Sequence, residues 1–372
     1  MAGPALAMLY VIAATTWIAA YSIWLAPLLS RSLTPRVSKW IIFLTITVLA
    51  LAIALINPLI DTAGFTVLGY QVGASDNDDA VRLGIAALLE GQNPYLQRTF
   101  LDQVIGPLPG SFVLGAPFYL LGSVAYASIF FLWLFWFLAS RQSATNGTLL
   151  FLLILTASPA VIYQALAGMD YTTDIMAVIG LSALAIHLRD KMLWLHLIAV
   201  GVGIAMATRI NLVLLAIPLM AVVFEYHGWR RALSTGIAMA AGFLAISVPF
   251  YLWDPDSFSP IQAGSDKVDG FSLGPLIFPL VGLAVGVMLA LLLPHRNVLD
   301  FYRDAFWIQF AILSLATLVR FLIDDPQARN YFNYGILALY PGALFFWARI
   351  TSRQQQRYVH QPDPRTAADQ AS

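Results

Sequence analysis

The sequence predicts an all-α polytopic membrane protein, a bundle of about eleven spanning helices, and two observations support this class. Of the 372 residues, 59% are hydrophobic and only 11% are charged, whereas a soluble domain carries about 25% charged residues. Apolar runs of about 20 residues, the length that spans a bilayer, recur along most of the chain. The chain has no cysteine, which excludes disulfides, zinc thiolates, iron–sulfur clusters and thiol nucleophiles. We therefore expect one membrane domain over residues 1–350 and a disordered polar tail over residues 351–372.

The apolar runs define the spans in chain order. The first run lacks the basic segment that begins a cleavable signal peptide, so we expect it to be retained as a helix. The expected spans are Ala5–Leu29, Trp40–Leu59, Ser111–Ala139, Thr148–Ala167, Tyr171–Leu188, Met192–Thr208, Ile210–Phe224, Ala232–Trp253, Ser272–Pro294, Ala305–Ile323 and Tyr331–Ala348. The third span is long, and Gly122 is the position at which it would bend or split. The sixth and seventh spans are short, with Arg209 between them.

The distribution of charge predicts the orientation. Most lysines and arginines fall on the side of the C-terminus, which the positive-inside rule assigns to the cytoplasm. Fusing the two short spans around Arg209 would turn Arg230, Arg231 and the tail arginines outward, so we keep the two spans separate. We expect a multi-pass protein of the plasma (inner) membrane with its N-terminus outside and its C-terminus in the cytoplasm. Both long loops and most acidic residues then face the extracytoplasmic side, where we expect the active site.

The first long outer loop, residues 61–110, contains the most informative stretch of the chain. Three aspartates, Asp76, Asp78 and Asp79, precede a segment whose apolar residues repeat at helical spacing. This pattern predicts an amphipathic helix over Asp79–Gly91 that lies along the outer membrane surface, with Asp78 or Asp79 capping its start.

The end of this helix and the number of its acidic residues carry further information. Gly91 is expected to end the helix, and Asn93-Pro94 is expected to make a turn. A cap or simple solvation would explain any one of the aspartates. Three aspartates within four residues exceed what a cap needs, so these carboxylates are expected either to be solvated at the membrane surface or to perform chemistry.

The three aspartates followed by Gly91-Gln-Asn-Pro-Tyr95 resemble the GT-C superfamily of membrane glycosyltransferases, which use polyprenyl-phosphate sugars. The pattern is most similar to the bacterial mannosyl- and arabinosyltransferase-like members. Two later stretches, residues 107–118 and 201–209, resemble the start of the family's third helix and a region in which members often carry Lys or Arg; the resemblance covers roughly residues 1–220. It implies that one of Asp76, Asp78 and Asp79 is the catalytic base, and that Asn93 and Tyr95 belong to the substrate-binding site.

Further charged residues lie near the expected outer ends of the spans. Asp170 and Asp174 are four residues apart and share one helix face, and Asp174 is costly there unless it is paired or hydrated. Arg209 either snorkels to the headgroups or grips a lipid-linked phosphate, because a guanidinium binds phosphate oxygens in pairs. Arg320 and Arg329 either supply a second phosphate contact or pair with neighbouring aspartates. The five histidines show no metal-ligand spacing and are expected in interface or surface roles.

The expected function is a glycosyltransferase that moves a sugar from a polyprenyl-phosphate donor to a glycan or glycolipid acceptor in cell-envelope biosynthesis. An aspartate of the first outer loop would act as general base, with inversion at the anomeric carbon. We expect no obligate metal or other cofactor. The expected partners are the donor, the acceptor and membrane lipid, and nucleic acid is not among them.

Two alternatives belong to other classes. A secondary transporter or lipid flippase needs a polar pathway at the membrane midplane, and the middles of the expected spans are nearly bare of charge. A non-catalytic subunit of a cell-envelope assembly complex would leave the three aspartates of the first loop unexplained.

Overall fold

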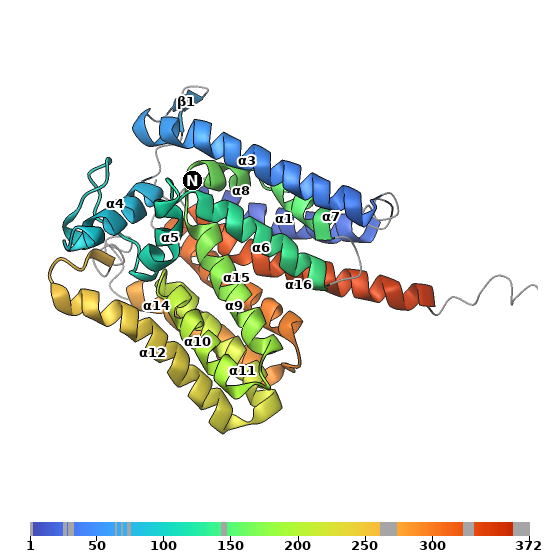
Figure 1. Ribbon diagram of the computed structural model, residues 1–372. Coiled ribbons are helices and arrows are strands. Elements are labelled where there is room, and N and C mark those ends of the chain that lie inside the picture. The colour runs from blue at the N-terminus through green and yellow to red at the C-terminus, as the bar shows by residue number, and fades with distance from the viewer. Residues whose placement is uncertain are drawn as a thin grey trace, which may run out of the picture.

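The computed structural model describes residues 3–24, 28, 33–63, 65–67, 70–72, 76–142, 147–260, 274–322 and 331–359. Figure 1 shows helices packed into one bundle, with α16 extending away from the end at which α4, α5 and a small hairpin lie. The helical class is therefore confirmed. The hairpin, in which Phe65–Val67 (β1) pairs antiparallel with Tyr70–Val72 (β2), was not expected from the sequence.

The helices that follow one another before the middle of the chain are α1 (Gly3–Trp24), α3 (Pro35–Ala63), α4 (Asn77–Leu89), η1 (Pro94–Leu96), α5 (Gly110–Leu120), α6 (Tyr126–Gln142), α7 (Gly147–Ala157), α8 (Pro159–Leu166) and α9 (Tyr171–His187). Those that follow are α10 (Met192–Met206), η2 (Ile210–Leu215), α11 (Ala216–His227), α12 (Trp229–Trp253), α14 (Gly274–Leu292), α15 (Val298–Leu322) and α16 (Tyr331–Val359).

Helix α9 lies at the centre of the bundle, where it contacts α6, α10 and α16 and buries nearly all of its side chains. Helices α3 and α12 lie on the outside and expose large apolar side chains such as Leu55 and Leu252. Helices α10 and α12 approach each other closely: a Cβ built on Gly203 would lie 1.9 Å from the Met239 carbonyl oxygen. Small residues at crossing points and apolar outer faces are typical of helices packed in lipid.

Three helical segments of the described residues are long and apolar enough to cross a membrane: Pro35–Leu59, Ile210–His227 and Trp229–Trp253. Several other apolar helices are shorter than a bilayer needs. The length and apolar composition of these three segments suggest a helical membrane protein, while the number of about eleven crossings remains a prediction.

Two of the expected spans are broken. Ser111–Ala139 splits into α5 and α6 around Gly122, whose φ of 109° is open to glycine. Thr148–Ala167 divides into α7 and α8, which meet at a bend of 84°. Ser158 adopts a non-helical conformation before Pro159, with a φ of −125° and a ψ of 82°, because proline disfavours the helical conformation in the residue that precedes it.

The helix boundary near Arg209 agrees with the sequence prediction, and the boundary in the tail differs from it. The chain is extended at Arg209, so α10 and the η2–α11 segment are separate elements, as expected. Helix α16 continues to Val359, which makes the first part of the tail helical. The rest of the tail, residues 360–372, lies outside the described residues.

Candidate active site at the N-terminal turns of four helices

A small cavity of about 20 Å³ lies where the N-terminal halves of α4, α5, α6 and α9 meet. Its polar lining includes Asp78, Ser111, Asp170 and Asp174. The volume is large enough to hold a water molecule or a single small polar group. The N-terminal end of a helix carries partial positive charge, which explains why carboxylates are tolerated in this buried place.

Asp78 is the aspartate of the first loop that lines this cavity. It is buried, with 3% of its surface exposed, and its Oδ2 accepts a hydrogen bond of 3.0 Å from Nδ2 of Asn57 on α3. Its Oδ1 accepts a 3.0 Å bond from the backbone N–H of Asp79. Gly168, with a φ of 65°, lies against it so closely that a Cβ there would be 2.4 Å from Oδ2. The carboxylate is therefore held from three directions.

The other two aspartates of the loop make different contacts. Asp76 Oδ2 accepts a 2.8 Å bond from the Thr99 hydroxyl. Asp79 accepts a 2.9 Å bond from the Phe100 backbone N–H and pairs with Arg82 at 2.5 Å. Neither residue lines the cavity.

The prediction that Asp78 or Asp79 caps the start of α4 is wrong. Helix α4 begins at Asn77, so Asp76 occupies the N-cap position and Asp78 and Asp79 lie within the first turn. The Asp76 side chain makes no capping bond, because it bonds to Thr99 instead. The end of the helix is as expected, with Gly91 at a φ of 71° after the last turn.

Arg209 is held by the pair of aspartates on α9. Its Nε donates to Asp174 Oδ2 at 2.5 Å, and its Nη2 contacts Asp170 Oδ1. The guanidinium carbon lies 4.0 Å from the centre of the Tyr171 ring, and 15% of the side chain is exposed. The shared face of Asp170 and Asp174 is confirmed. The Arg209 guanidinium is bound by these two carboxylates, and both expected roles, snorkelling to the headgroups and binding a lipid-linked phosphate, stay predictions.

Three polar atoms in the lining residues are buried without a hydrogen-bond partner among the described residues: Ser111 Oγ, Asp170 Oδ2 and Asp174 Oδ1. Buried acceptors without partners cost free energy, so such atoms mark a place where a donor is missing. The cluster also has more carboxylates than cations, with Asp78, Asp170 and Asp174 around one Arg209. Within the described part of the chain, no group of three or more His, Cys, Asp or Glu is arranged to hold a metal ion.

Asn93 and Tyr95 hold the first loop in place. Asn93 accepts a 3.0 Å bond from the Tyr95 backbone N–H and donates one of 3.0 Å to the Ser257 hydroxyl. The Tyr95 hydroxyl donates to the Pro107 carbonyl at 3.2 Å, and its ring packs on Phe258 with 4.9 Å between centroids. Burial raises the pKa of Tyr95 above its usual value. Neither residue lines the cavity, and their role in substrate binding stays a prediction.

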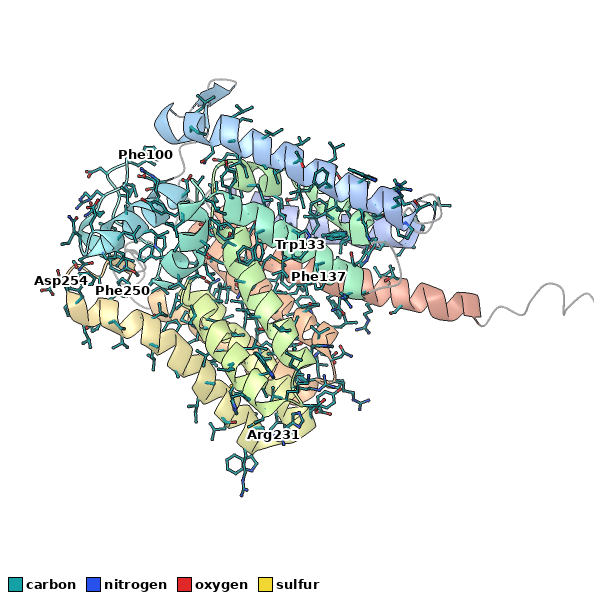
Figure 2. All side chains as sticks on the ribbon, viewed as in Figure 1. Phe100, Trp133, Phe137, Arg231, Phe250 and Asp254 are labelled. Carbon is teal, nitrogen blue, oxygen red and sulfur yellow. The ribbon has the colours of Figure 1, made fainter. Side chains whose placement is uncertain are left out.

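The aromatic residues around Tyr95 join this loop to α12. Figure 2 shows Phe250 and Asp254 at the end of α12 on the side of the first loop, and Phe250 lies 6.2 Å from Tyr95 between ring centroids. The loop that carries Asp78 is thus anchored to the bundle on one side by aromatic packing.

The two remaining candidates are not placed. Arg329 lies outside the described residues, and Arg320 lies in α15 with its side chain not described. The sequence by itself assigns none of Ser111, Gly168 and Asn57 to the site. The one available signal was chemical: Asn57 is an amide inside an apolar run, where it needs a hydrogen-bond partner.

A second buried cluster lies at the start of α15. His295 Nε2 and Asp304 Oδ2 are 2.5 Å apart, and Arg303 Nε donates to Asp304 Oδ1 at 2.7 Å. His295 is only 2% exposed, so the expected interface or surface role is wrong for this histidine. His295 lies in the turn between α14 and α15, and its contact with Asp304, nine residues later, brings it against the first turns of α15.

Comparison of the chain with protein-family models, with curated proteins and with solved structures found no match in any of the three. The cavity and its residues are therefore the basis for any statement about function.

Proposed function

We propose that this protein is an integral-membrane glycosyltransferase that uses a polyprenyl-phosphate sugar, with Asp78 as its general base. One observation carries the proposal: Asp78, from the acidic stretch of the first loop, lines the same cavity as Asp170 and Asp174, which bind Arg209. A base, hydroxyl-binding acceptors and a cation are the groups that inverting sugar transfer from a lipid phosphate needs.

The proposed reaction assigns Asp78 the proton of the acceptor hydroxyl. The hydroxyl oxygen attacks the anomeric carbon from the face opposite the phosphate, and the bond from that carbon to the phosphate oxygen breaks. The leaving group departs as polyprenyl phosphate, so the anomeric configuration inverts. No acid is needed, because phosphate is already a good leaving group.

The unpartnered atoms fit a ligand rich in hydroxyl groups. The cavity has room for one such hydroxyl group, which could donate to Asp170 Oδ2, Asp174 Oδ1 or Ser111 Oγ and would thereby remove the cost of leaving that atom buried alone. Arg209, kept beside the cavity by the two aspartates, would stabilise the charge that develops on the leaving phosphate.

The proposal includes the placement in the membrane. The cavity would lie on the extracytoplasmic side of a plasma (inner) membrane, with about eleven crossings, the N-terminus outside and the C-terminus in the cytoplasm. Helix α4, which buries Val81 and Ile85 and ends at exposed residues, would lie along the outer surface beside the cavity. The acceptor would be a glycan or glycolipid that reaches this surface.

The test is sugar transfer by the purified, reconstituted protein. The donors would be polyprenyl-phosphate mannose and polyprenyl-phosphate arabinose with labelled sugars, and the acceptor a glycolipid extract of the host membrane. Asp78→Asn should lower the rate by on the order of 10²–10⁴, the usual cost of removing a positioned base. Asp76→Asn and Asp79→Asn are matched controls, since they change neighbouring carboxylates that do not line the cavity, and should have milder effects.

Two results would count against the proposal. Sugar transfer at the wild-type rate by Asp78→Asn would show that Asp78 is not the general base. Absence of transfer by the wild type with both donors, combined with uptake or flipping of a solute or lipid by the same proteoliposomes, would favour a transporter instead.

A further inference from the structure

A chain of hydrogen bonds runs from the start of α6 to Asp78. The backbone N–H of Ala125 donates to the Ser123 hydroxyl at 3.2 Å, and this hydroxyl donates to Asn57 Oδ1 at 3.4 Å. Asn57 Nδ2 then donates to Asp78 Oδ2 at 3.0 Å. All three donors point in the same direction, toward the carboxylate.

The chain determines which way the Asn57 amide faces. The backbone N–H of Ala125 can only donate, so the Ser123 oxygen accepts from it and its own proton is directed at Asn57. Asn57 therefore presents its oxygen to Ser123 and its NH₂ group to Asp78. The reverse orientation would place two acceptor oxygens against each other at Asp78.

The position of Asn57 is unusual for an amide. It is 5% exposed and lies within Pro35–Leu59, one of the apolar segments long enough to cross a membrane. A buried amide in such a segment is costly unless its hydrogen bonds are made, and the carboxylate of Asp78 satisfies it. If the hydrogen bond of Asn57 served only to join two helices, a neutral partner would be enough. Its partner is instead the carboxylate of Asp78, which lines the cavity.

We propose that Asn57 is a positioning residue that keeps Asp78 ionised and turned toward the cavity, with Ser123 and the start of α6 supporting it. The inference rests on the proposed function for its meaning in catalysis, but its physical content is independent of any substrate. A hydrogen bond donated to a carboxylate favours the charged form. A base that must accept a proton has to be ionised beforehand.

Other charged groups face Asp78 and act on its ionisation as well. Asp170 and Asp174 on α9 lie across the cavity and oppose its negative charge, while Arg209 supports it. Asp79, next to it on α4, is paired with Arg82. Because Asp170 and Asp174 line the same cavity as Asp78, the hydrogen bond donated by Asn57 helps to keep Asp78 charged against them.

The test is an infrared titration of the full-length protein in lipid nanodiscs. The Asp78 signal is isolated as the difference between spectra with Asp78 and with Asp78→Asn, measured in the wild type and in the Asn57→Leu background. Loss of one hydrogen bond to a charged group should raise the pH at which Asp78 is half protonated by roughly one unit, a change of about tenfold in proton affinity. Ser123→Ala should give a smaller shift in the same direction.

A matched control lies on the same helix. Among the described residues, the Thr45 hydroxyl donates to the Ile41 carbonyl one turn earlier at 2.8 Å, so Thr45→Val should leave the titration unchanged. If Asn57→Leu does not fold, Asn57→Ala and Ser123→Ala carry the test, because both remove atoms without adding bulk. An unchanged Asp78 midpoint in the folded Asn57 variants would overturn the inference.

Sugar transfer provides the second arm. If the proposed function holds, Asn57→Leu should move the acidic limb of the pH–rate profile upward by the same roughly one unit, with KM for the donor unchanged. A shifted infrared titration without any sugar transfer by the wild type would keep the inference and reject the proposed function. An unshifted Asp78 titration in the Asn57 variants, together with active sugar transfer by the wild type, would reject the inference and keep the proposed function.

Discussion

The two buried charge clusters of this protein differ in how completely they are satisfied. In the cluster at the start of α15, every carboxylate oxygen has a donor: Asp304 bonds His295 and Arg303, and Asp300 bonds Arg303 and two backbone N–H groups. In the cavity cluster, Asp170 and Asp174 share Arg209, and each leaves one buried oxygen without a partner among the described residues.

The difference separates a structural cluster from a candidate site. A fully bonded buried network holds elements together and has no vacancy for a ligand, and breaking it costs stability. A network with unpartnered acceptors around a cavity carries a cost that a donor from outside can remove. Variants at equivalent positions in the two clusters should therefore have different consequences.

The largest effects are expected from the two arginines. Arg209→Ala strands two buried carboxylates, which should lower the free energy of unfolding by about 3–5 kcal/mol. Arg303→Ala should cost less, because Asp304 keeps its bond to His295 and Asp300 keeps two backbone N–H donors. Thermal unfolding in detergent, followed by intrinsic fluorescence, should show a lower Tm for both. Only Arg209→Ala should also abolish sugar transfer by the molecules that remain folded, and Arg209→Lys should weaken donor binding because the paired N–H geometry is lost.

Neutralising the partners sharpens this comparison. In the triple variant Arg209→Ala, Asp170→Asn, Asp174→Asn, the stranded charges are gone, so most of the lost Tm should return while sugar transfer stays absent. Recovery of transfer together with stability would mean that Arg209 only neutralises the two aspartates and has no part in the reaction.

A smaller effect is expected from Gly168, which lies against Asp78. Gly168→Ala places a residue with a Cβ at a φ of 65° and drives that Cβ to 2.4 Å from Asp78 Oδ2. Gly91→Ala is the matched control, since its φ is 71° and nothing lies within 4 Å of its Cβ. Both should lose about 1–2 kcal/mol through the backbone conformation. Gly168→Ala should lose more stability than Gly91→Ala and should also slow sugar transfer. If the two variants lose the same stability and transfer sugar at the same rate, Asp78 moves aside freely.

The smallest effect is expected from Ser111, whose hydroxyl is buried and unpartnered among the described residues. Ser111→Ala should leave the Tm unchanged or slightly higher, because it removes an unsatisfied group, and should raise KM for the sugar substrate. Ser22→Ala is the comparison, since its hydroxyl donates to the Ile18 carbonyl at 2.6 Å and its loss should cost about 1 kcal/mol. A drop in Tm for Ser111→Ala with KM unchanged would return Ser111 to a purely structural role.

Local features of the site followed from the sequence because they depend on neighbours along the chain. The spacing of Asp170 and Asp174 determines that they share a helix face, and Gly91 ends α4 because a positive φ suits glycine. The sequence predicted either a bend or a break at Gly122, since a lone glycine bends a helix in some surroundings and ends it in others.

The sequence by itself determined the helical class, the presence of helices apolar enough to span a membrane, the position of the acidic stretch along the chain and the shared face of Asp170 and Asp174. Composition and short-range spacing decide these features. Only the tertiary structure decided that Asp78 is the loop aspartate that reaches the cavity, that Asn57 and Gly168 hold it, and that Arg209 turns to α9. The physical reason is distance along the chain. Asn57 and Asp78 are 21 residues apart and Asp174 and Arg209 are 35 apart, so these contacts depend on how helices pack and on which buried group needs a partner.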